Sequence, residues 1–243
     1  MYGLYDPDLT SAGIHQCEEL CEEIEKLKPD LIFTSPLIRA FNTSLISTKK
    51  LFQNRENKDL LKFSIIATNL LRESFNSTSD IGSEKNKLEE TKNFYLEEYE
   101  NTKNKELVIS NIDDERKEKE ENKKEIILNE TNSINNTINN KVELKFIVKK
   151  FWWNYLEDKE ENRNIIVKET SKEIFIRIIL LLLWSFLREE NKLIFVSHSK
   201  IFPYFTCHNN KEKAKHGKLI KLDSNFLINK LIEYLLEIQE GVE

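Results

Sequence analysis

A short apolar run that ends on a histidine constrains the fold of this chain more than any other feature. In the segment NKLIFVSHS, the residues Ile194, Phe195 and Val196 follow one another with no polar residue between them. This pattern is typical of a strand buried on both faces of a sheet. Ligands of open α/β sheets bind beyond the carboxyl ends of such strands. His198 is therefore predicted to face a crevice, the plain alternative being a hydrogen-bonded histidine in an ordinary loop.

Helices and two further strands are expected before this run. Thr10 is expected to cap a helix of about five turns, and Pro29 ends it. Residues 30–33 (DLIF) form a short strand, and Ser35 caps a second helix whose first residue is Pro36. A third strand at Phe63–Ala67, a loop at Leu70–Glu73 and a long helix at 169–188 follow. Strands and helices alternate, so the sequence predicts an α/β fold, a three-layer α/β/α sandwich around a mostly parallel sheet. The strands at 30–33 and 192–197 are expected to be parallel and central in that sheet.

The composition changes in the middle of the chain. From about Tyr99 to Lys141, Asn, Lys, Glu and Asp predominate, and proline and glycine are absent. Such a segment buries too little apolar surface to offset the entropy of ordering it. We therefore expect a disordered or loosely helical insertion at 99–141, with residues 1–98 and 142–243 forming a single domain.

The overall composition argues against several classes of protein. A net charge of −5 disfavours a general nucleic-acid binder. The most apolar segment, 174–187, is too short to span a membrane and is interrupted by Arg177. The cysteines are few and odd in number, which favours a reducing compartment, so a cytoplasmic protein is expected. Cys17 and Cys21 share a helix face with Ile24 and are expected to pack in the core.

Two more residues are candidates for chemistry at the same crevice. Arg39 lies in the first turn of the second helix, where a guanidinium and free N–H groups suit a phosphate; a surface arginine is the plain alternative. Glu73, after an apolar pair, is a candidate carboxylic acid or else a surface glutamate. The spacing of Cys207, His208 and His216 fits no standard zinc pattern, so no metal site is expected.

Six motifs occur in one order along most of the chain. They are YDPDLTSAGIHQC (5–17), SPLIRAFNTS (35–44), LLRE (70–73), SDIG (79–82), Trp152-Trp153 and VSHS (196–199). This set resembles the histidine phosphatase superfamily, and within it the phosphoglycerate mutase-like proteins of the fungal and plant branch. The resemblance covers roughly 2–95 and 145–205, and SPLIRAFNTS is its most specific piece. Lys200 stands where that family often has glycine, so the loop after His198 is expected to differ.

The resemblance implies a role for each candidate residue. Arg39, His198 and Ser197 would bind the transferred phosphoryl group, and His198 would also stabilise charge in the transition state. Glu73 would protonate the leaving oxygen, with Asp80 a weaker candidate for that acid. The implied ligand is a phosphorylated small molecule or a phosphoprotein, with no cofactor, no metal, no nucleic acid and no membrane. Phosphatase activity is favoured over mutase activity, because no motif identifies a phosphoglycerate pocket.

One part of the family's pattern is absent. The family's nucleophile is the histidine of an Arg-His-Gly triplet at the end of its first central strand, and that triplet occurs nowhere in this chain. We expect the sequence to be an incomplete version of a longer protein, inactive as written. The alternative is a non-catalytic protein that binds a phosphorylated ligand. A serine hydrolase that uses Ser35 or Ser197 with His198 is a third possibility, although the chain has no Gly-x-Ser-x-Gly motif.

Overall fold

The fold is described from a computed structural model of the chain, which covers residues 4–53, 63–112, 142–143, 168–205 and 217–240. The α-helices are α1 (Ser11–Leu27), α2 (Ile38–Ser47), α3 (Lys49–Gln53), α4 (Lys85–Ile112), α6 (Ser171–Phe186) and α7 (Ser224–Glu240). The strands are β1 (Leu31–Thr34), β2 (Ser64–Ala67), β3 (Val142–Glu143) and β4 (Leu193–Val196). Short 3-10 turns at η2 (Asn69–Leu71), η3 (Thr78–Asp80) and η5 (Phe202–Tyr204) connect them. The three strands predicted from apolar runs are confirmed as β1, β2 and β4.

All strand pairs in the sheet are parallel, in the order β3-β2-β1-β4. Phe33 of β1 lies beside Ile66 on one side and Phe195 on the other. We expected both β1 and β4 to be central, and this is wrong for β4, which is the outer strand in the described part of the chain. Its four residues are all partly exposed, whereas those of β1 are fully buried.

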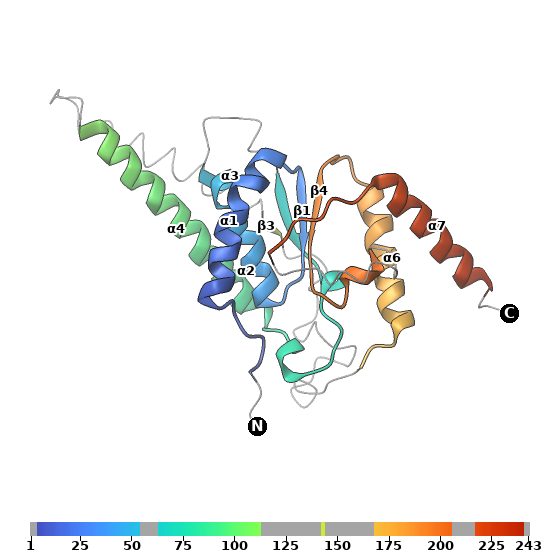
Figure 1. Cartoon of the computed structure of the whole chain (residues 1–243). Coiled ribbons are helices and arrows are strands. Elements are labelled where there is room, and N and C mark those ends of the chain that lie inside the picture. Colours follow the sequence, from blue (N-terminus) through green and yellow to red (C-terminus); the bar gives the residue numbers. More distant parts are fainter. Residues whose placement is uncertain (1–3, 54–62, 113–141, 144–167, 206–216, 241–243) are drawn as a thin grey trace.

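Helices cover both faces of the sheet, which confirms the predicted three-layer α/β/α architecture (Figure 1). Successive residues of a strand point to opposite faces, and β1 divides accordingly between two cores. Ile32 packs with residues of α1, α2 and α4, whereas Leu31 and Phe33 pack with α6 and α7. Because both faces are covered, the strand has no polar alternation, as its sequence indicated.

Helix α1 begins where its sequence predicts. The Thr10 hydroxyl accepts a hydrogen bond from the Gly13 N–H (3.2 Å), and the helix ends at Leu27. Cys17 and Cys21 are buried against α2, and the Cys21 thiol contacts the Ile46 carbonyl oxygen at 3.1 Å. The expectation that they pack in the core is confirmed.

The helix predicted at 169–188 is α6, and Thr170 caps it by accepting a bond from the Glu173 N–H (3.2 Å). Among the described residues, no helix is long and apolar enough to cross a membrane. Helix α4 runs to Ile112, into the stretch expected as an insertion, and Tyr99 is buried with its hydroxyl donating to Leu45 O (2.9 Å). Residues 113–141 lie outside the described part, so the division into domain and insertion stays a prediction.

Candidate active site

The carboxyl ends of β1 and β4 lie side by side and bring two distant polar segments together. Thr34 and Val196 pair at the last position of the two strands, and the Ser35 N–H continues the ladder to Val196 O (3.0 Å). Two residues beyond Val196, His198 Nε2 lies 2.8 Å from Ser35 Oγ. The prediction that the polar residues after these two strands share one edge of the sheet is confirmed.

The helix that carries Arg39 begins later than its sequence indicates. Its first residue is Ile38 and its N-cap is Leu37, whereas Pro36 was expected at the first position with Ser35 as cap. Ser35 Oγ does accept from the Leu37 N–H (3.3 Å). The Ile38 N–H, however, donates to Oδ1 of Asp6 (2.9 Å). A carboxylate 32 residues away in the chain therefore takes over part of the capping.

Asp6 is a site residue that was assigned no individual role from the sequence, although it lies in the YDPDLT motif. Its second oxygen accepts from the Ser83 N–H (2.7 Å), so one carboxylate joins α2 to the loop after η3. Burial raises the pKa of Asp6, and the bonds from Ser83 and Ile38 oppose that rise. Its backbone has a positive φ of 37°, which is uncommon for a residue with a side chain.

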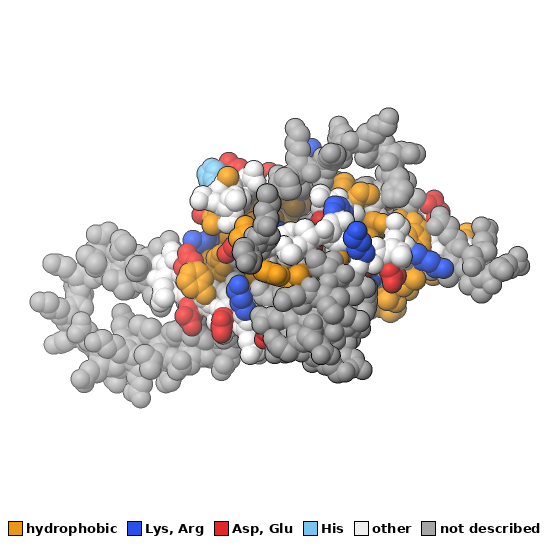
Figure 2. Space-filling view, turned by 90° about the horizontal axis from the view of Figure 1, so that it is seen from below, with side chains coloured by type: hydrophobic (Ala, Val, Ile, Leu, Met, Phe, Trp, Pro, Cys, Tyr) orange, Lys and Arg blue, Asp and Glu red, His pale blue; other side chains and the backbone are white. Residues whose placement is uncertain are grey.

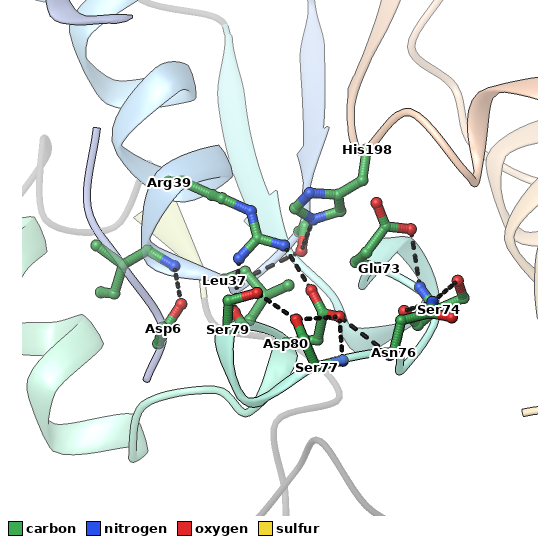
Figure 3. A network of polar contacts seen from close by, with 12 residues as sticks. Asp6, Leu37, Arg39, Glu73, Ser74, Asn76, Ser77, Ser79, Asp80 and His198 are labelled. Atoms are coloured by element: carbon green, nitrogen blue, oxygen red, sulfur yellow. Dashed lines mark hydrogen bonds and ion pairs between the residues drawn. The ribbon is translucent and has the colours of Figure 1, made fainter. Parts of the chain in front are cut away.

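Arg39 points toward the same edge and is held by the η3 turn (Figure 3). Its Nη1 donates to Ser79 O (2.9 Å) and its Nη2 to Asp80 Oδ1 (3.0 Å). The other oxygen of Asp80 accepts from the backbone N–H groups of Asn76 (3.1 Å) and Ser77 (3.2 Å). A guanidinium has five N–H donors, so these two bonds orient Arg39 and leave donors for an anion. Asp80 was the weaker candidate for the general acid, and in the structure it forms an ion pair with Arg39.

Glu73 lies beside His198 and Asp80 in the close-up view (Figure 3). The side chain is buried, and its Oε1 accepts from the Ser74 N–H (2.9 Å). Burial raises the pKa of Glu73 and the charge of Asp80 raises it further, against the opposing effects of Ser74, Lys200 and Arg39. A carboxyl that holds its proton to a higher pH is suited to act as a general acid.

His198 is partly buried, and its pKa lies well below its ordinary value. Loss of hydration is the largest cause, and the positive charges of Arg39 and Arg177 add to it. The imidazole is therefore neutral near pH 7, with one ring N–H to donate. Ser197, expected to bind phosphate, donates its hydroxyl to Leu71 O instead (2.9 Å), so that role remains a prediction.

The Ser35–His198 contact bears on the serine-hydrolase alternative. A nucleophilic serine needs both an adjacent base and access to substrate. Ser35 is fully buried, and its Oγ also accepts from the Leu37 N–H. The contact therefore joins the two strand ends and gives no support to a serine nucleophile.

Other predicted features are only partly placed. The tryptophan pair and the residues Cys207, His208 and His216 lie outside the described residues. Where the structure does describe side chains, no group of three or more metal-ligating residues occurs. Figure 2 views the molecule from below Figure 1, and Lys and Arg side chains lie near the middle of that face beside hydrophobic ones.

The low pKa of His198 predicts a pH effect on stability. Between that pKa and the ordinary value of 6.5, the unfolded chain binds a proton that the folded chain does not. The free energy of unfolding should therefore fall as the pH falls through about 6.5, by up to about 1.4 kcal/mol per pH unit for this group. Urea unfolding at pH 7.0 and 5.5 measures the loss.

In His198→Gln the loss of stability between these pH values should be smaller. His15→Gln is the matched control, because it removes an imidazole whose side chain is 72% exposed on α1, and the loss that His198 causes should remain. An equal loss in the wild type and in His198→Gln would contradict the prediction.

Comparison with known proteins relates the first part of the chain to a protein family. The family profile described as histidine phosphatase superfamily (branch 1) matches residues 1–62. The matched part contains α1, β1 and α2 with Arg39, and ends before Glu73 and His198. None of the curated proteins and none of the solved structures compared with the chain matches it. The match supports a phosphatase- or mutase-like function in general terms.

Proposed function

We propose that this chain is a histidine phosphatase superfamily protein of the phosphoglycerate mutase-like branch, and that it binds the phosphoryl group of a phosphomonoester between Arg39 and His198. The observation that carries the proposal is the meeting of these two side chains at one edge of a parallel sheet, with Glu73 beside them. The profile match over residues 1–62 supports it independently.

Each side chain has a task that its environment supports. Arg39, already oriented by Asp80 and Ser79, supplies positive charge and N–H donors to the phosphoryl oxygens. His198 is neutral before binding, and an arriving dianion favours its protonation and strengthens its bond to the phosphate. Glu73 holds its proton to a higher pH and gives it to the leaving oxygen of the ester.

The proposed reaction is hydrolysis through a phosphohistidine. A histidine nitrogen attacks phosphorus, the bond from phosphorus to the ester oxygen breaks, and that oxygen takes the proton of Glu73. Water then cleaves the phosphorus–nitrogen bond and releases inorganic phosphate. The attacking histidine would come from a further strand, and the outer edge of β4 is where such a strand can pair and end next to His198. The ligand is a phosphorylated small molecule or phosphoprotein in the cytoplasm, and no metal takes part.

A second candidate function is binding of a phosphorylated ligand without turnover. One observation favours it for the 243-residue chain. Apart from His198, the only other histidine among the described residues is His15, whose side chain is 72% exposed on α1 and pairs with Glu18 and Glu19. No described histidine other than His198 therefore lies at the site to act as a nucleophile.

Binding of inorganic phosphate or orthovanadate tests both candidates. We expect saturable binding by calorimetry at pH 7, and a loss of about tenfold to a hundredfold in affinity for Arg39→Ala, since hydrogen bonds to charged groups contribute about 1.5–3 kcal/mol. Arg39→Lys should fall between, because lysine keeps the charge but not the planar donors.

Arg188→Ala is the matched control for the loss of one arginine. Arg188 pairs with Glu190 and lines a hollow with Asp30 and Trp184, away from Arg39 and His198. This variant should bind phosphate as the wild type does. Equal affinity in Arg39→Ala and the wild type would overturn the proposed phosphate site.

A further inference from the structure

A buried ionic cluster lies next to the proposed acid and outside the phosphate site. It consists of Arg72, Glu169 and Arg177. Arg177 donates from Nε and Nη2 to the two oxygens of Glu169 (3.0 and 3.1 Å), and Arg72 Nη1 lies 2.8 Å from Glu169 Oε1. The side chain of Glu169 is 0% exposed, and those of the two arginines are at most 6% exposed.

The cluster joins two segments that are distant in the sequence, the turn before Glu73 and the start of α6. Arg72 directly precedes Glu73, Glu169 directly precedes the N-cap residue of α6, and Arg177 lies two turns into that helix. Helix α6 packs on the sheet through its buried residues, among them Ile178 and Leu181. Its position is therefore fixed by apolar packing, and the cluster transmits that position to the segment before Glu73.

The backbone before Glu73 is held residue by residue. Arg177 Nη1 donates to Leu70 O (2.6 Å), and the Ser197 hydroxyl donates to Leu71 O (2.9 Å). The next residue, Arg72, is itself part of the cluster. Leu70 is thus bound to α6, Leu71 to the residue after β4, and Arg72 to Glu169 just before α6. The next residue is Glu73, whose side chain is buried.

We propose that Arg177, acting with Arg72 and Glu169, is a positioning residue that fixes segment 70–73 and so sets where Glu73 presents its carboxyl group. The part that Glu73 plays in catalysis rests on the proposed function. Burying three charged groups costs desolvation free energy, and apolar residues of similar volume generally stabilise a helix as well or better. Bidentate arginine–carboxylate geometry gives a directional contact that apolar packing does not.

The cluster also brings charge to the site. The positive charge of Arg177 is one of the causes that disfavour protonation of His198. Lysine at position 177 keeps a positive charge but cannot make the paired bonds to Glu169 and reach Leu70 O. The variants Arg177→Lys and Arg177→Met therefore separate the geometric effect from the charge effect.

Two local measurements distinguish positioning from simple fastening of α6. The first is amide hydrogen exchange at Leu71 and Arg72, whose N–H groups donate to Thr68 O and Asn69 O (both 3.2 Å) in the turn that precedes Glu73. The second is the ¹³C-detected pH titration of the Glu73 carboxyl, assigned with Glu73→Gln. In Arg177→Lys we expect exchange of the two amides to be at least tenfold faster, and the pKa of Glu73 to fall toward its ordinary value as water reaches the carboxyl.

Ile178→Val is the matched control. Ile178 is the next residue of α6 and is fully buried, so its truncation loosens the packing of the helix without touching a polar contact. Neither the exchange of Leu71 and Arg72 nor the pKa of Glu73 should change beyond error.

The pKa of His198 should rise in Arg177→Met and stay close to the wild-type value in Arg177→Lys.

The outcomes decide the proposal separately from the proposed function. Unchanged Glu73 titration and exchange in a folded Arg177→Lys, or equal changes in Ile178→Val, would overturn the positioning role. If the Arg177 variants do not fold, the same measurements are made on Glu169→Gln. Amide hydrogen exchange in the unmodified chain is an independent test, because rapid exchange of Leu71 and Arg72 would contradict a fixed segment 70–73. Phosphate binding by the unmodified chain tests the proposed function alone, since neither Glu73 measurement depends on it.

Discussion

The 243-residue chain is expected to hydrolyse phosphomonoesters no faster than background, whereas a form with an additional Arg-His-Gly strand on the outer edge of β4 should turn them over. The expected difference is about 10⁴–10⁶-fold, the usual effect of removing a covalent nucleophile. The reason is geometric. In the described part of the sheet β4 is the outer strand, and a strand parallel to it on that side would end beside His198 and place its histidine across the crevice from Arg39.

The experiment compares three proteins with a panel of phosphomonoesters and no added metal. They are the 243-residue chain, a version to which a strand ending in Arg-His-Gly is joined at the N-terminus, and that extended version with the histidine of Arg-His-Gly replaced by alanine. The extended protein alone should release phosphate, and acid quenching should trap a phosphohistidine. The alanine version should keep a cooperative melt, which separates chemistry from folding.

Within the extended protein, Glu73→Gln should slow the first step most for substrates with poor leaving groups. Replacing a general acid typically costs about 10²–10⁴-fold, and the loss should shrink when the leaving group is a nitrophenol that departs without a proton. Substantial turnover by the 243-residue chain itself would contradict the proposal and would direct attention to His198 as the phosphoryl acceptor.

The sheet and three of its site residues could be predicted from the sequence because the signals are local. A short apolar run between polar residues, such as Leu193–Val196, indicates a strand, and a parallel sheet places the ends of its strands together. Arg39 and His198 each lie within a few residues of such an end, so their meeting followed from the order of the elements. Glu73 was placed by the same logic after β2.

The remaining contacts depend on residues far apart in the chain and have no local signal. Ser35-Pro36 is a good helix start by its own preferences, yet α2 begins at Ile38, where the carboxylate of Asp6 binds the helix N–H. The pairing of Arg39 with Asp80 spans 41 residues, and the Arg177 contact to Leu70 spans 107. Such pairs depend on how the loops pack over the ends of the strands. The spacing of residues within one motif does not predict that packing.

Phe33→Ala is expected to lower the free energy of unfolding by about 3–5 kcal/mol, the usual cost of deleting a buried phenylalanine. Phe33 is fully buried in β1, with its ring 5.6 Å from that of Phe195 and 4.8 Å from that of Trp184. No neighbouring backbone can fill the space, because the sheet fixes both flanking strands. Urea unfolding at pH 7 measures the change.

Phe94→Ala is the matched control, since it deletes the same side chain from α4, where it is 63% exposed. Its cost should stay below about 1 kcal/mol, because little apolar surface is lost from the core. Equal losses of unfolding free energy in the two variants would contradict the burial on which the fold rests.

Phe33→Ala should also affect the site, because Phe33 and Phe195 align β1 with β4 one residue before Thr34 and Val196. Phosphate affinity should therefore fall in Phe33→Ala and not in Phe94→Ala, even where both proteins are fully folded.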